Sequence, residues 1–388
     1  MRKITVIKNG TIITPFKTIK NGVVIFEDKK ITAVGKESDV KMPKEAKAID
    51  ASDKTVAPGF IDIHIHGGRG RDVMEVSYEA INELAKFVAS HGTTAFLPTT
   101  VSASRGDLLR AVRAVKTVME RGTEGAEVLG VHLEGPYINL EKRGAHDAEY
   151  VRPPSLDEVD ELLEVANRTI KIVTLAPEVN GSEELIKQLA KLGIVASIGH
   201  SNATYQEAMN AIELGVTHAA HTFNEMRSFH HREPGILGAV LVHDELTTEL
   251  IPDNIHMHPV AMKLLVKTKG TNKVVLVTDA IQAAGMPNGK YKLGKQNVTV
   301  EKGVCRLESG ELAGSTLTMD EAVRNTMKSV GTPLRTAIKM ATINPAVAIS
   351  VDKKKGSLEP GKDADIVIID GEVNVYVTIV KGKVVYKV

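Results

Sequence analysis

The middle of the chain alternates between short apolar runs and segments whose apolar residues recur at the helical period. Eight runs have the length and composition of buried strands. They span residues 59–66, 93–100, 128–135, 170–177, 193–200, 216–223, 247–254 and 273–280. This alternation predicts parallel strands joined by helical crossovers.

Helical segments separate most of these runs. Residues 81–88 place four apolar side chains on one helical face. A later helix is predicted over 319–330, where Thr318 and Glu321 form a capping box before it and Gly331 ends it.

Eight strand–helix units in about 250 residues have the size of a (β/α)8 TIM-type barrel, which is the predicted α/β fold. An open, doubly wound sheet is the alternative. The G-x-G-x-x-G turn that a dinucleotide-binding sheet of that kind carries is missing after the first run.

Both ends of the chain instead consist of short alternating runs with turn residues between them. Asn9-Gly10 and Asn21-Gly22 separate the runs near the N-terminus, and such pairs predict hairpin turns. Neither end has enough strands for a stable sheet of its own. We therefore expect a small β-sandwich domain built from residues 1–57 and 356–388, with a barrel domain of residues 58–355 between them.

Composition narrows the classes of partner. The 388 residues carry a net charge of +1, and neither a nucleic-acid binder nor a protein bound to an anionic membrane is expected without a basic surplus. No apolar stretch reaches the roughly 18 residues of a membrane span. The single cysteine, Cys305, has no disulfide partner within the chain, and a cytoplasmic location is expected.

Acidic and imidazole side chains gather at or near the carboxyl ends of five predicted strands. In a barrel these ends meet at one mouth, where active sites are built. Mixed imidazole and carboxylate groups suit Zn²⁺, Fe²⁺ or Mn²⁺ with a coordination position left for water. The six residues are His64, His66, Glu134, His200, His221 and Asp279.

The chain contains, in order, PGFIDIHIHGG, VHLEGPYIN, IGHSNA, THAAHTFNEM, HREPG and LVTDA. Together these segments closely resemble the N-acetylglucosamine-6-phosphate deacetylase family of the amidohydrolase superfamily, over nearly the whole chain. The resemblance implies hydrolysis of the acetamide of N-acetylglucosamine 6-phosphate, giving glucosamine 6-phosphate and acetate, in amino-sugar catabolism and cell-wall sugar recycling.

The resemblance also implies a metal centre. Glu134, His200 and His221 match the ligands of the principal metal. His64 and His66 lie where some members hold a second metal, so one or two divalent ions per subunit are implied. Zn²⁺ or Fe²⁺ is expected first, with Mn²⁺ or Co²⁺ as further candidates.

By the same resemblance, Asp279 matches the catalytic acid/base and His256 the residue that polarises the acetyl carbonyl. Arg232 matches a phosphate-binding arginine that reaches the neighbouring subunit's site, which implies a homodimer. Further substrate-binding positions fall on Ala145, Asn224, Glu225, Asp253, Asn254, Ile255, Leu312, Ala313 and Gly314.

Two positions depart from the family pattern. Asn254 stands where the family usually has glycine, which puts the backbone near His256 in question because asparagine adopts left-handed conformations less freely. Glu225 stands where a small residue is common. Its side chain is expected to point away from the sugar phosphate, which it would repel.

Other interpretations stay open from the sequence. Another amidohydrolase, such as a cyclic-amide hydrolase or a deaminase, is one, although the third strand offers Glu134 and no lysine for a carboxylated bridge. A barrel kept as a binding scaffold is another. Of the other residues, His132 is predicted to hydrogen-bond behind the site, His218 to pack away from it, and the run from Lys353 to Lys355 to form a solvated turn.

Overall fold

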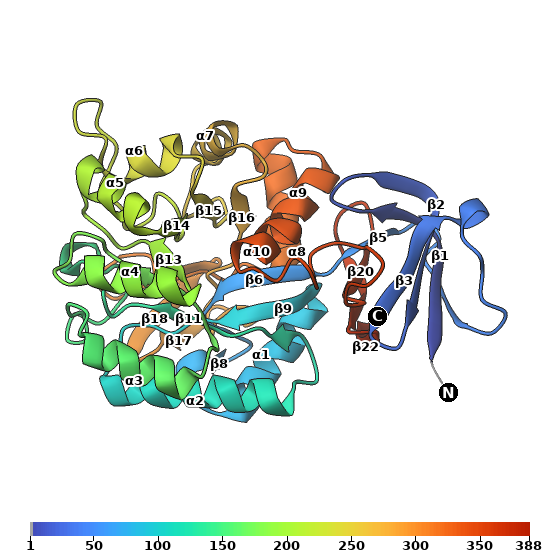
Figure 1. Ribbon diagram of the computed structural model, residues 1–388, viewed down its shortest axis with the longest axis horizontal. Helices are drawn as coiled ribbons and strands as arrows, with labels where there is room; N and C mark the ends of the chain where they lie inside the picture. Colours follow the sequence, from blue (N-terminus) through green and yellow to red (C-terminus); the bar gives the residue numbers. More distant parts are fainter. Residues whose placement is uncertain (1–2) are drawn as a thin grey trace.

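The structure, a computed structural model, describes residues 3–388. A small sheet domain lies at one end of the molecule and contains both chain ends (Figure 1). Its strands pair in the order β22-β21-β20-β5-β1-β2-β3, with β4 beside β1. They are β1 (Ile4–Ile13), β2 (Thr18–Glu27), β3 (Lys30–Lys36), β4 (Lys47–Asp50), β5 (Thr55–Pro58), β20 (Ile366–Ile369), β21 (Val375–Val380) and β22 (Lys383–Lys387).

The two chain ends join through the antiparallel pair β5 and β20, in which Val56 lies opposite Ile368. Val56 of β5 and Ile366 and Ile368 of β20 point into one apolar cluster, which side chains of β1 and β21 share. The predicted β-sandwich fold built from both ends is therefore confirmed.

The predicted hairpin turns at the Asn-Gly pairs are wrong. Strand β1 continues through Asn9-Gly10, where its pairing with β2 changes register, and β2 continues through Asn21. Both asparagines have a positive φ, 67° and 49°. A β-bulge uses the same left-handed conformation as a hairpin turn, so the dipeptide alone cannot distinguish the two. The hairpin turn lies later, where the Thr14 and Lys17 backbones pair.

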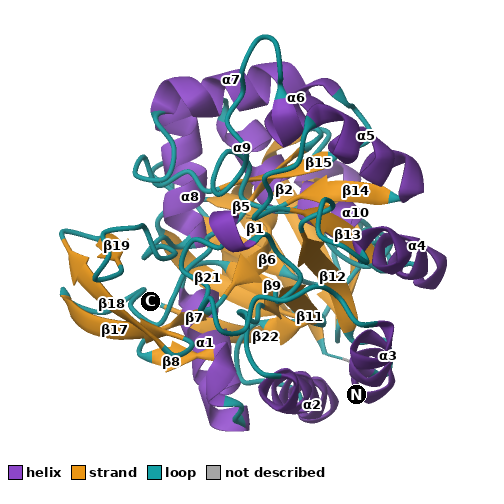
Figure 2. Ribbon diagram, turned by 90° about the vertical axis from the view of Figure 1, so that its left-hand side faces the viewer, coloured by secondary structure: helices purple, strands orange, loops and turns teal. Residues whose placement is uncertain are grey.

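All eight apolar runs form strands of a parallel barrel, which Figure 2 shows viewed along its axis. The isolated bridge between Thr99 and His132 joins β9 to β11, and the bridge between Ile65 and Ala280 closes the circle. The strands are β6 (Phe60–Ile65), β9 (Thr93–Pro98), β11 (Val131–Glu134) with the short β10 (Glu127–Val128) before it, β12 (Ile170–Leu175), β13 (Val195–Ile198), β14 (Val216–Ala219), β15 (Thr247–Leu250) and β16 (Val274–Leu276).

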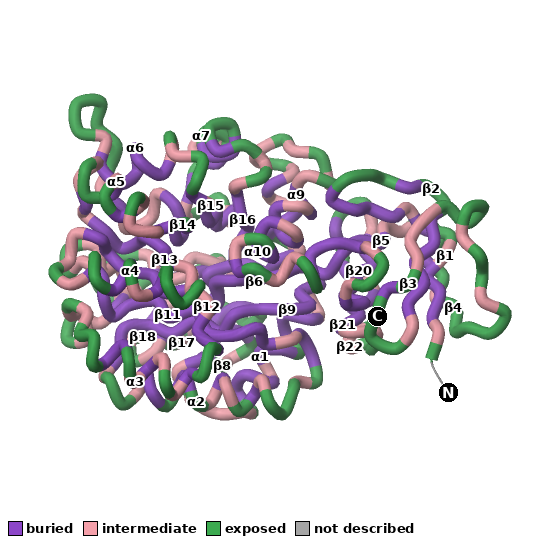
Figure 3. Tube along the Cα trace, in the orientation of Figure 1, coloured by how far each residue is buried: buried purple, intermediate pink, exposed green. Residues whose placement is uncertain are grey.

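Helices follow the barrel strands and cover the outside of the barrel, as the buried interior in Figure 3 shows. The predicted apolar face of residues 81–88 is buried on α1, and the capping box at Thr318 begins α8 as predicted. The helices are α1 (Tyr78–Ser90), α2 (Arg105–Arg121), α3 (Leu156–Ala166), α4 (Ser182–Leu192), α5 (Tyr205–Leu214), α6 (Gly235–Val242), α7 (Pro259–Lys269), α8 (Met319–Asn325) continued by a π-helical turn (Thr326–Val330), α9 (Leu334–Ala341) and α10 (Ile343–Ala348).

A three-stranded antiparallel sheet of β17 (Gly289–Leu293), β18 (Gln296–Glu301) and β19 (Val304–Arg306) is inserted between β16 and α8. Sequence analysis assigned no structure to this segment. Its apolar side packs beside the barrel mouth, where Leu293 and Val298 join a cluster with Ile281. Among residues 3–388, no helix has the length and apolar character needed to cross a membrane.

Lys355 corrects another expectation. The run from Lys353 was predicted to be a solvated turn, but the Lys355 side chain is only 4% exposed. Its ammonium contacts carboxylates of Asp365 at 2.6 Å, Asp363 at 3.1 Å and Glu127 at 2.6 Å. Because Glu127 belongs to β10, this cluster links the barrel to the segment that returns to the small sheet.

Candidate metal centre

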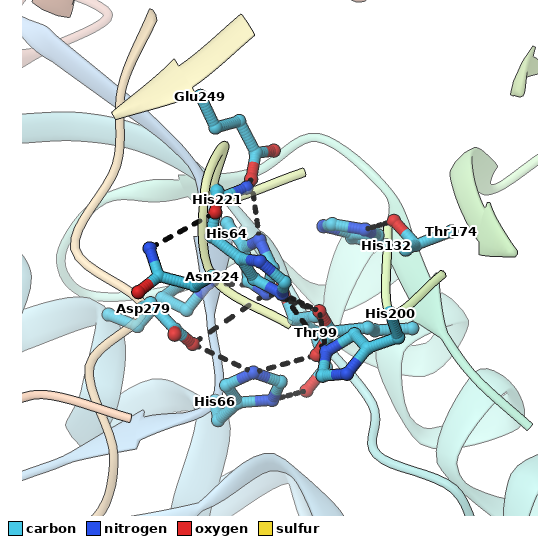
Figure 4. A network of polar contacts seen from close by, with 12 residues as sticks. His64, His66, Thr99, His132, Thr174, His200, His221, Asn224, Glu249 and Asp279 are labelled. Carbon is cyan, nitrogen blue, oxygen red and sulfur yellow. Dashed lines mark hydrogen bonds and ion pairs between the residues drawn. The ribbon is translucent and has the colours of Figure 1, made fainter. Parts of the chain in front are cut away.

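The barrel topology brings the predicted ligands together at one end. Parallel strands share a direction, so the residues that follow them meet at the same rim. Glu134 ends β11, His200 follows β13 and His221 follows β14, while Asp279 lies beyond β16. Figure 4 shows His200, His221 and Asp279 gathered around His64 of β6 and His66, the residue that follows this strand.

Glu134, His200 and His221 form one group of possible ligands. His221 Nε2 lies 3.0 Å from Glu134 Oε1 and 3.0 Å from His200 Nε2, and His200 Nε2 lies 3.4 Å from the same Glu134 oxygen. All three side chains are buried. A buried carboxylate facing two imidazole nitrogens at one point is a donor set suited to a divalent cation.

His64, His66 and Asp279 form a second, adjoining group. His66 Nε2 lies 3.1 Å from Asp279 Oδ1 and 3.2 Å from Glu134 Oε2. His64 Nε2 lies 3.2 Å from Glu134 Oε1. Glu134 therefore touches both groups, and its two oxygens face different histidines.

The outer nitrogens of three of these histidines are held by acceptors, which fixes the rings. Nδ1 of His200 lies 2.8 Å from the Lys142 carbonyl, and Nδ1 of His66 lies 3.2 Å from that of Thr99. Nδ1 of His64 lies 2.8 Å from the Glu249 carboxylate. Each Nδ1 therefore donates, and each ring in its neutral form would offer the Nε2 lone pair to a cation at the centre. This arrangement is typical of metal-binding histidines, and the residues fit a metal.

Charges reinforce this arrangement. Burial raises the pKa of Glu134, but the charge of His64 and hydrogen bonds from further histidines hold it well below its usual range. Burial likewise raises the pKa of Asp279. The hydrogen bond from His66 and the charges of His64 and His66 nevertheless lower this pKa to about 2. Both carboxylates are ionised at neutral pH, so the site attracts cations.

The backbone at the rim is strained. His200, His221 and Asp279 have positive φ angles of 47°, 21° and 48°. Side chains larger than glycine rarely adopt this region, which costs about 1–3 kcal/mol for each residue. Here the sharp turn after each strand aims the side chain back into the mouth of the barrel.

A cavity of about 240 Å³ opens beside the two groups of ligands. Of the predicted substrate-binding residues, it is lined by Ala145, Asn224, Glu225, His256, Leu312 and Gly314, together with Asp279 and the ligands other than His64. Ala313 is buried in the cluster behind this wall. Arg232 is exposed on the loop before α6 and does not line the cavity.

The carboxylate of Asp253 holds His256 in place at the cavity. Its Oδ2 lies 2.6 Å from His256 Nδ1, and its Oδ1 accepts the backbone N–H groups of Ile255 and His256. This leaves Nε2 as the ring nitrogen that can meet a substrate. Ile255 itself is 39% exposed. The intervening Asn254 has a φ of 63°, so asparagine adopts the left-handed conformation that the family's glycine would provide.

Glu225 lines the cavity, and its side chain packs over Gly144, where a Cβ would lie only 2.9 Å from Glu225 Cγ. Its orientation relative to a sugar phosphate stays a prediction. Its backbone has a φ of 50°, and its carbonyl oxygen accepts the Ser201 N–H. The strained turn fixes the main chain against Ser201, so the side chain lies over Gly144 at the wall.

Two buried residues near the centre are not among the predicted ligands, catalytic residues or substrate-binding residues. His146 contacts Glu134 at 3.5 Å, and its Nδ1 accepts the N–H of Ser102. Glu249 contacts His64 from behind. His146 lies in a loop, where the sequence does not show which way a side chain points. Glu249 is an acidic residue inside the apolar run of β15, and that was a usable signal. His132 hydrogen-bonds to the Ile63 carbonyl and the Thr174 hydroxyl, as predicted for a residue behind the site.

The barrel, its cavity and two adjoining ligand groups define a metal-dependent hydrolase of the amidohydrolase type. A family model described as "Amidohydrolase family" matches residues 55–385, and the chain belongs to that family. Its full-length relatives place it with the N-acetylglucosamine-6-phosphate deacetylases. One, from Bacillus subtilis, is 39% identical over 100% of this chain and 98% of its own.

The names of two further relatives include phosphorylated N-acetyl sugars. An N-acetylgalactosamine-6-phosphate deacetylase from Escherichia coli O157:H7 is 40% identical over 84% of this chain and 87% of its own. A mutant N-acetyl-D-glucosamine-6-phosphate deacetylase from Mycobacterium smegmatis was solved in complex with N-acetyl-D-glucosamine 6-phosphate. It aligns over all of both chains with a TM-score of 0.92 and 31% identity. The resemblance and the barrel fold inferred from sequence are thereby confirmed.

Proposed function

We propose that the chain hydrolyses the acetamide of N-acetylglucosamine 6-phosphate to glucosamine 6-phosphate and acetate. The observation that carries this is the convergence of Glu134, His200 and His221 with Asp279 at one cavity, in a chain whose full-length relatives have this activity in their names. The complex of the mycobacterial relative supports the same substrate.

Glu134, His200 and His221 would hold the principal metal, and His64 and His66 a second one. Zn²⁺ or Fe²⁺ suits these imidazole and carboxylate donors, with Mn²⁺ or Co²⁺ as alternatives. A divalent ion bound there would polarise the acetyl carbonyl and ease deprotonation of the attacking water.

Asp279 would be the acid/base. Its carboxylate is ionised at neutral pH and lines the cavity beside the ligands, so it has an oxygen free to accept a proton from the attacking water. It would then deliver that proton to the departing amine nitrogen. His256, held through Nδ1 by Asp253, would hydrogen-bond to the carbonyl oxygen as negative charge develops there.

The remaining wall residues would bind the sugar. Asn224 is held by its own side-chain N–H, which donates to the His221 carbonyl, so the sugar-binding wall is tied to a metal ligand. Ala145, Leu312 and Gly314 would contact the sugar through short side chains and backbone.

Arg232 would bind the phosphate of a substrate in the neighbouring subunit of a homodimer. Its exposure, and its absence from the cavity lining of its own chain, support this proposal. A guanidinium suits phosphate because its planar donors match two oxygens at once.

The deciding experiment measures acetate release after the metal-free protein is reconstituted with defined metals. N-acetylglucosamine 6-phosphate should be hydrolysed much faster than N-acetylglucosamine. N-acetylgalactosamine 6-phosphate serves as the comparison substrate because of the relative that bears its name. Equal rates with and without the phosphate, or turnover of a hydantoin or adenine instead, would overturn the proposal.

A further inference from the structure

Glu249 is a fully buried acid that the proposed mechanism leaves without a role. It lies on β15, a strand that contributes no predicted metal ligand, and its exposed fraction is 0%. An unpaired charge at such a depth is costly, so the partners of this carboxylate indicate what it does.

Its two oxygens reach two ligand-bearing segments. Oε2 lies 2.8 Å from His64 Nδ1 and accepts the backbone N–H of His221 at 2.9 Å. Oε1 lies 3.0 Å from Nε2 of His218, a buried histidine outside both ligand groups. Figure 4 shows Glu249 on the opposite side of His64 from the centre.

The contact with His64 determines which nitrogen faces the centre. In the neutral ring that a metal requires, with its proton on Nδ1, Nε2 presents a lone pair, and this nitrogen has no hydrogen-bond partner among the described residues. That nitrogen lies 3.2 Å from Glu134 Oε1 and 3.7 Å from Asp279 Oδ1. A lone pair facing two carboxylates is repulsive unless a cation lies between them.

The contact with His221 supports a strained turn. His221 has a φ of 21°, and its N–H is held by the Glu249 side chain. The next N–H, of Thr222, donates to the Glu249 carbonyl at 3.1 Å. Glu249 therefore holds the amide groups on both sides of the His221 Cα, which aims the His221 ring at Glu134.

We propose that Glu249 is a positioning residue shared by both ligand groups, which fixes the tautomer of His64 and the backbone of His221 so that both rings face a divalent cation. This inference rests on the proposed metal-dependent function. Glu249 touches no substrate, and its effect passes through the two histidines. Carboxylates that orient metal-binding histidines in this way typically change metal affinity by 10- to 100-fold.

The test is calorimetric titration of the metal-free protein with Zn²⁺, with bound zinc counted by elemental analysis. Glu249→Gln keeps the shape of the side chain but replaces one acceptor oxygen with a donor. We expect it to weaken zinc binding by about 10- to 100-fold while the metal-free protein keeps a cooperative thermal transition. The matched control is Thr174→Val, which removes a buried hydrogen bond to His132 and should leave zinc affinity unchanged.

The outcomes separate this proposal from the proposed function. Wild-type zinc affinity in Glu249→Gln, or equal losses in Glu249→Gln and Thr174→Val, would overturn the role of Glu249 and leave the metal centre intact. A wild-type protein that binds no zinc yet hydrolyses the substrate would overturn both. If Glu249→Gln does not fold, the same titration is made on Glu249→Asp, whose shorter carboxylate should also weaken binding.

Discussion

Asp279 lies where the ligand groups meet the cavity, with its carboxylate 3.1 Å from His66 Nε2. Asp279→Asn keeps the shape of the side chain but cannot take up a proton from water. We expect turnover to fall by about 100-fold or more, which is the usual contribution of a positioned acid/base. Acetate release under saturating substrate measures this.

The control for this variant is Asp53→Asn, an exposed position in the small sheet domain, which should keep full activity. Zinc content should be counted for both proteins, since a loss of metal would mimic a loss of proton transfer. Turnover of Asp279→Asn at the wild-type rate would exclude Asp279 as the acid/base.

A substitution at Asp253 tests the role of His256. Asp253→Asn retains one oxygen for the backbone N–H groups but weakens the hold on His256 Nδ1. If His256 acts only as the carbonyl oxygen gains charge, kcat should fall by about 10- to 100-fold with little change in KM. A rise in KM at constant kcat would instead show that His256 merely binds the substrate.

Among the elements, the link between barrel and small sheet depends on Lys355. Its three carboxylate partners raise its pKa above the ordinary value of 10.5, although burial alone would lower it. Lys355→Met leaves the buried Asp365 without a cationic partner, whereas Asp363 keeps Lys30 and Glu127 keeps Lys381. We expect the free energy of unfolding to fall by about 3–5 kcal/mol, measured by urea unfolding at neutral pH. Lys354→Met, at the exposed neighbouring position, should change it by less than about 0.5 kcal/mol.

The same lysine sets a pH dependence. A pKa that is higher in the folded than in the unfolded protein contributes stability that is complete below the unfolded value and lost as pH rises. The difference between wild type and Lys355→Met should therefore stay constant up to about pH 10 and shrink at higher pH. A difference that grows with alkalinity would contradict this assignment.

Strands and helices with a clear pattern of apolar residues could be predicted from the sequence. The eight apolar runs all became barrel strands because buried parallel strands have little freedom in composition. Asn9-Gly10 was misassigned because a bulge and a turn demand the same φ. The sheet of β17 to β19 was overlooked, although the glycines at 294 and 303 are turn signals between its short strands.

The convergence of the candidate ligands could be predicted because strand ends in a barrel meet at one rim, whatever the loops do. The contacts that hold these ligands from the side away from the cavity could not be predicted. They depend on which side chains meet across the barrel interior. Glu249 and Lys355 are both charged residues whose partners come from distant segments. A sequence shows such a charge but does not show its counter-charge.

For the molecule as a whole, metal should contribute to stability as well as to activity. A ligand that binds only the folded state, at about 1,000 times its Kd, stabilises it by about 4 kcal/mol. Chelation should therefore abolish acetate release and lower the melting temperature, as measured by calorimetry, and added Zn²⁺ should restore both. Full activity and an unchanged transition after complete metal removal would contradict a metal centre at Glu134.

The proposed dimer can be tested by mixing two inactive variants. Arg232→Ala lacks the phosphate-binding group that would serve the neighbour, and Asp279→Asn lacks the acid/base of its own site. A hybrid dimer would then contain one complete site, with about half the wild-type activity. No recovery on mixing, or a monomer in light scattering, would show that Arg232 does not act across an interface.

The unfavourable torsions at His200, His221 and Asp279 have an evolutionary consequence. Glycine at any of these three rim positions would relax the main chain, so heat tolerance could be gained there by discarding a chemical group. A laboratory selection for thermal endurance alone would accumulate such losses and end with robust, inert barrels. Retaining all three side chains requires that catalysis itself be under selection.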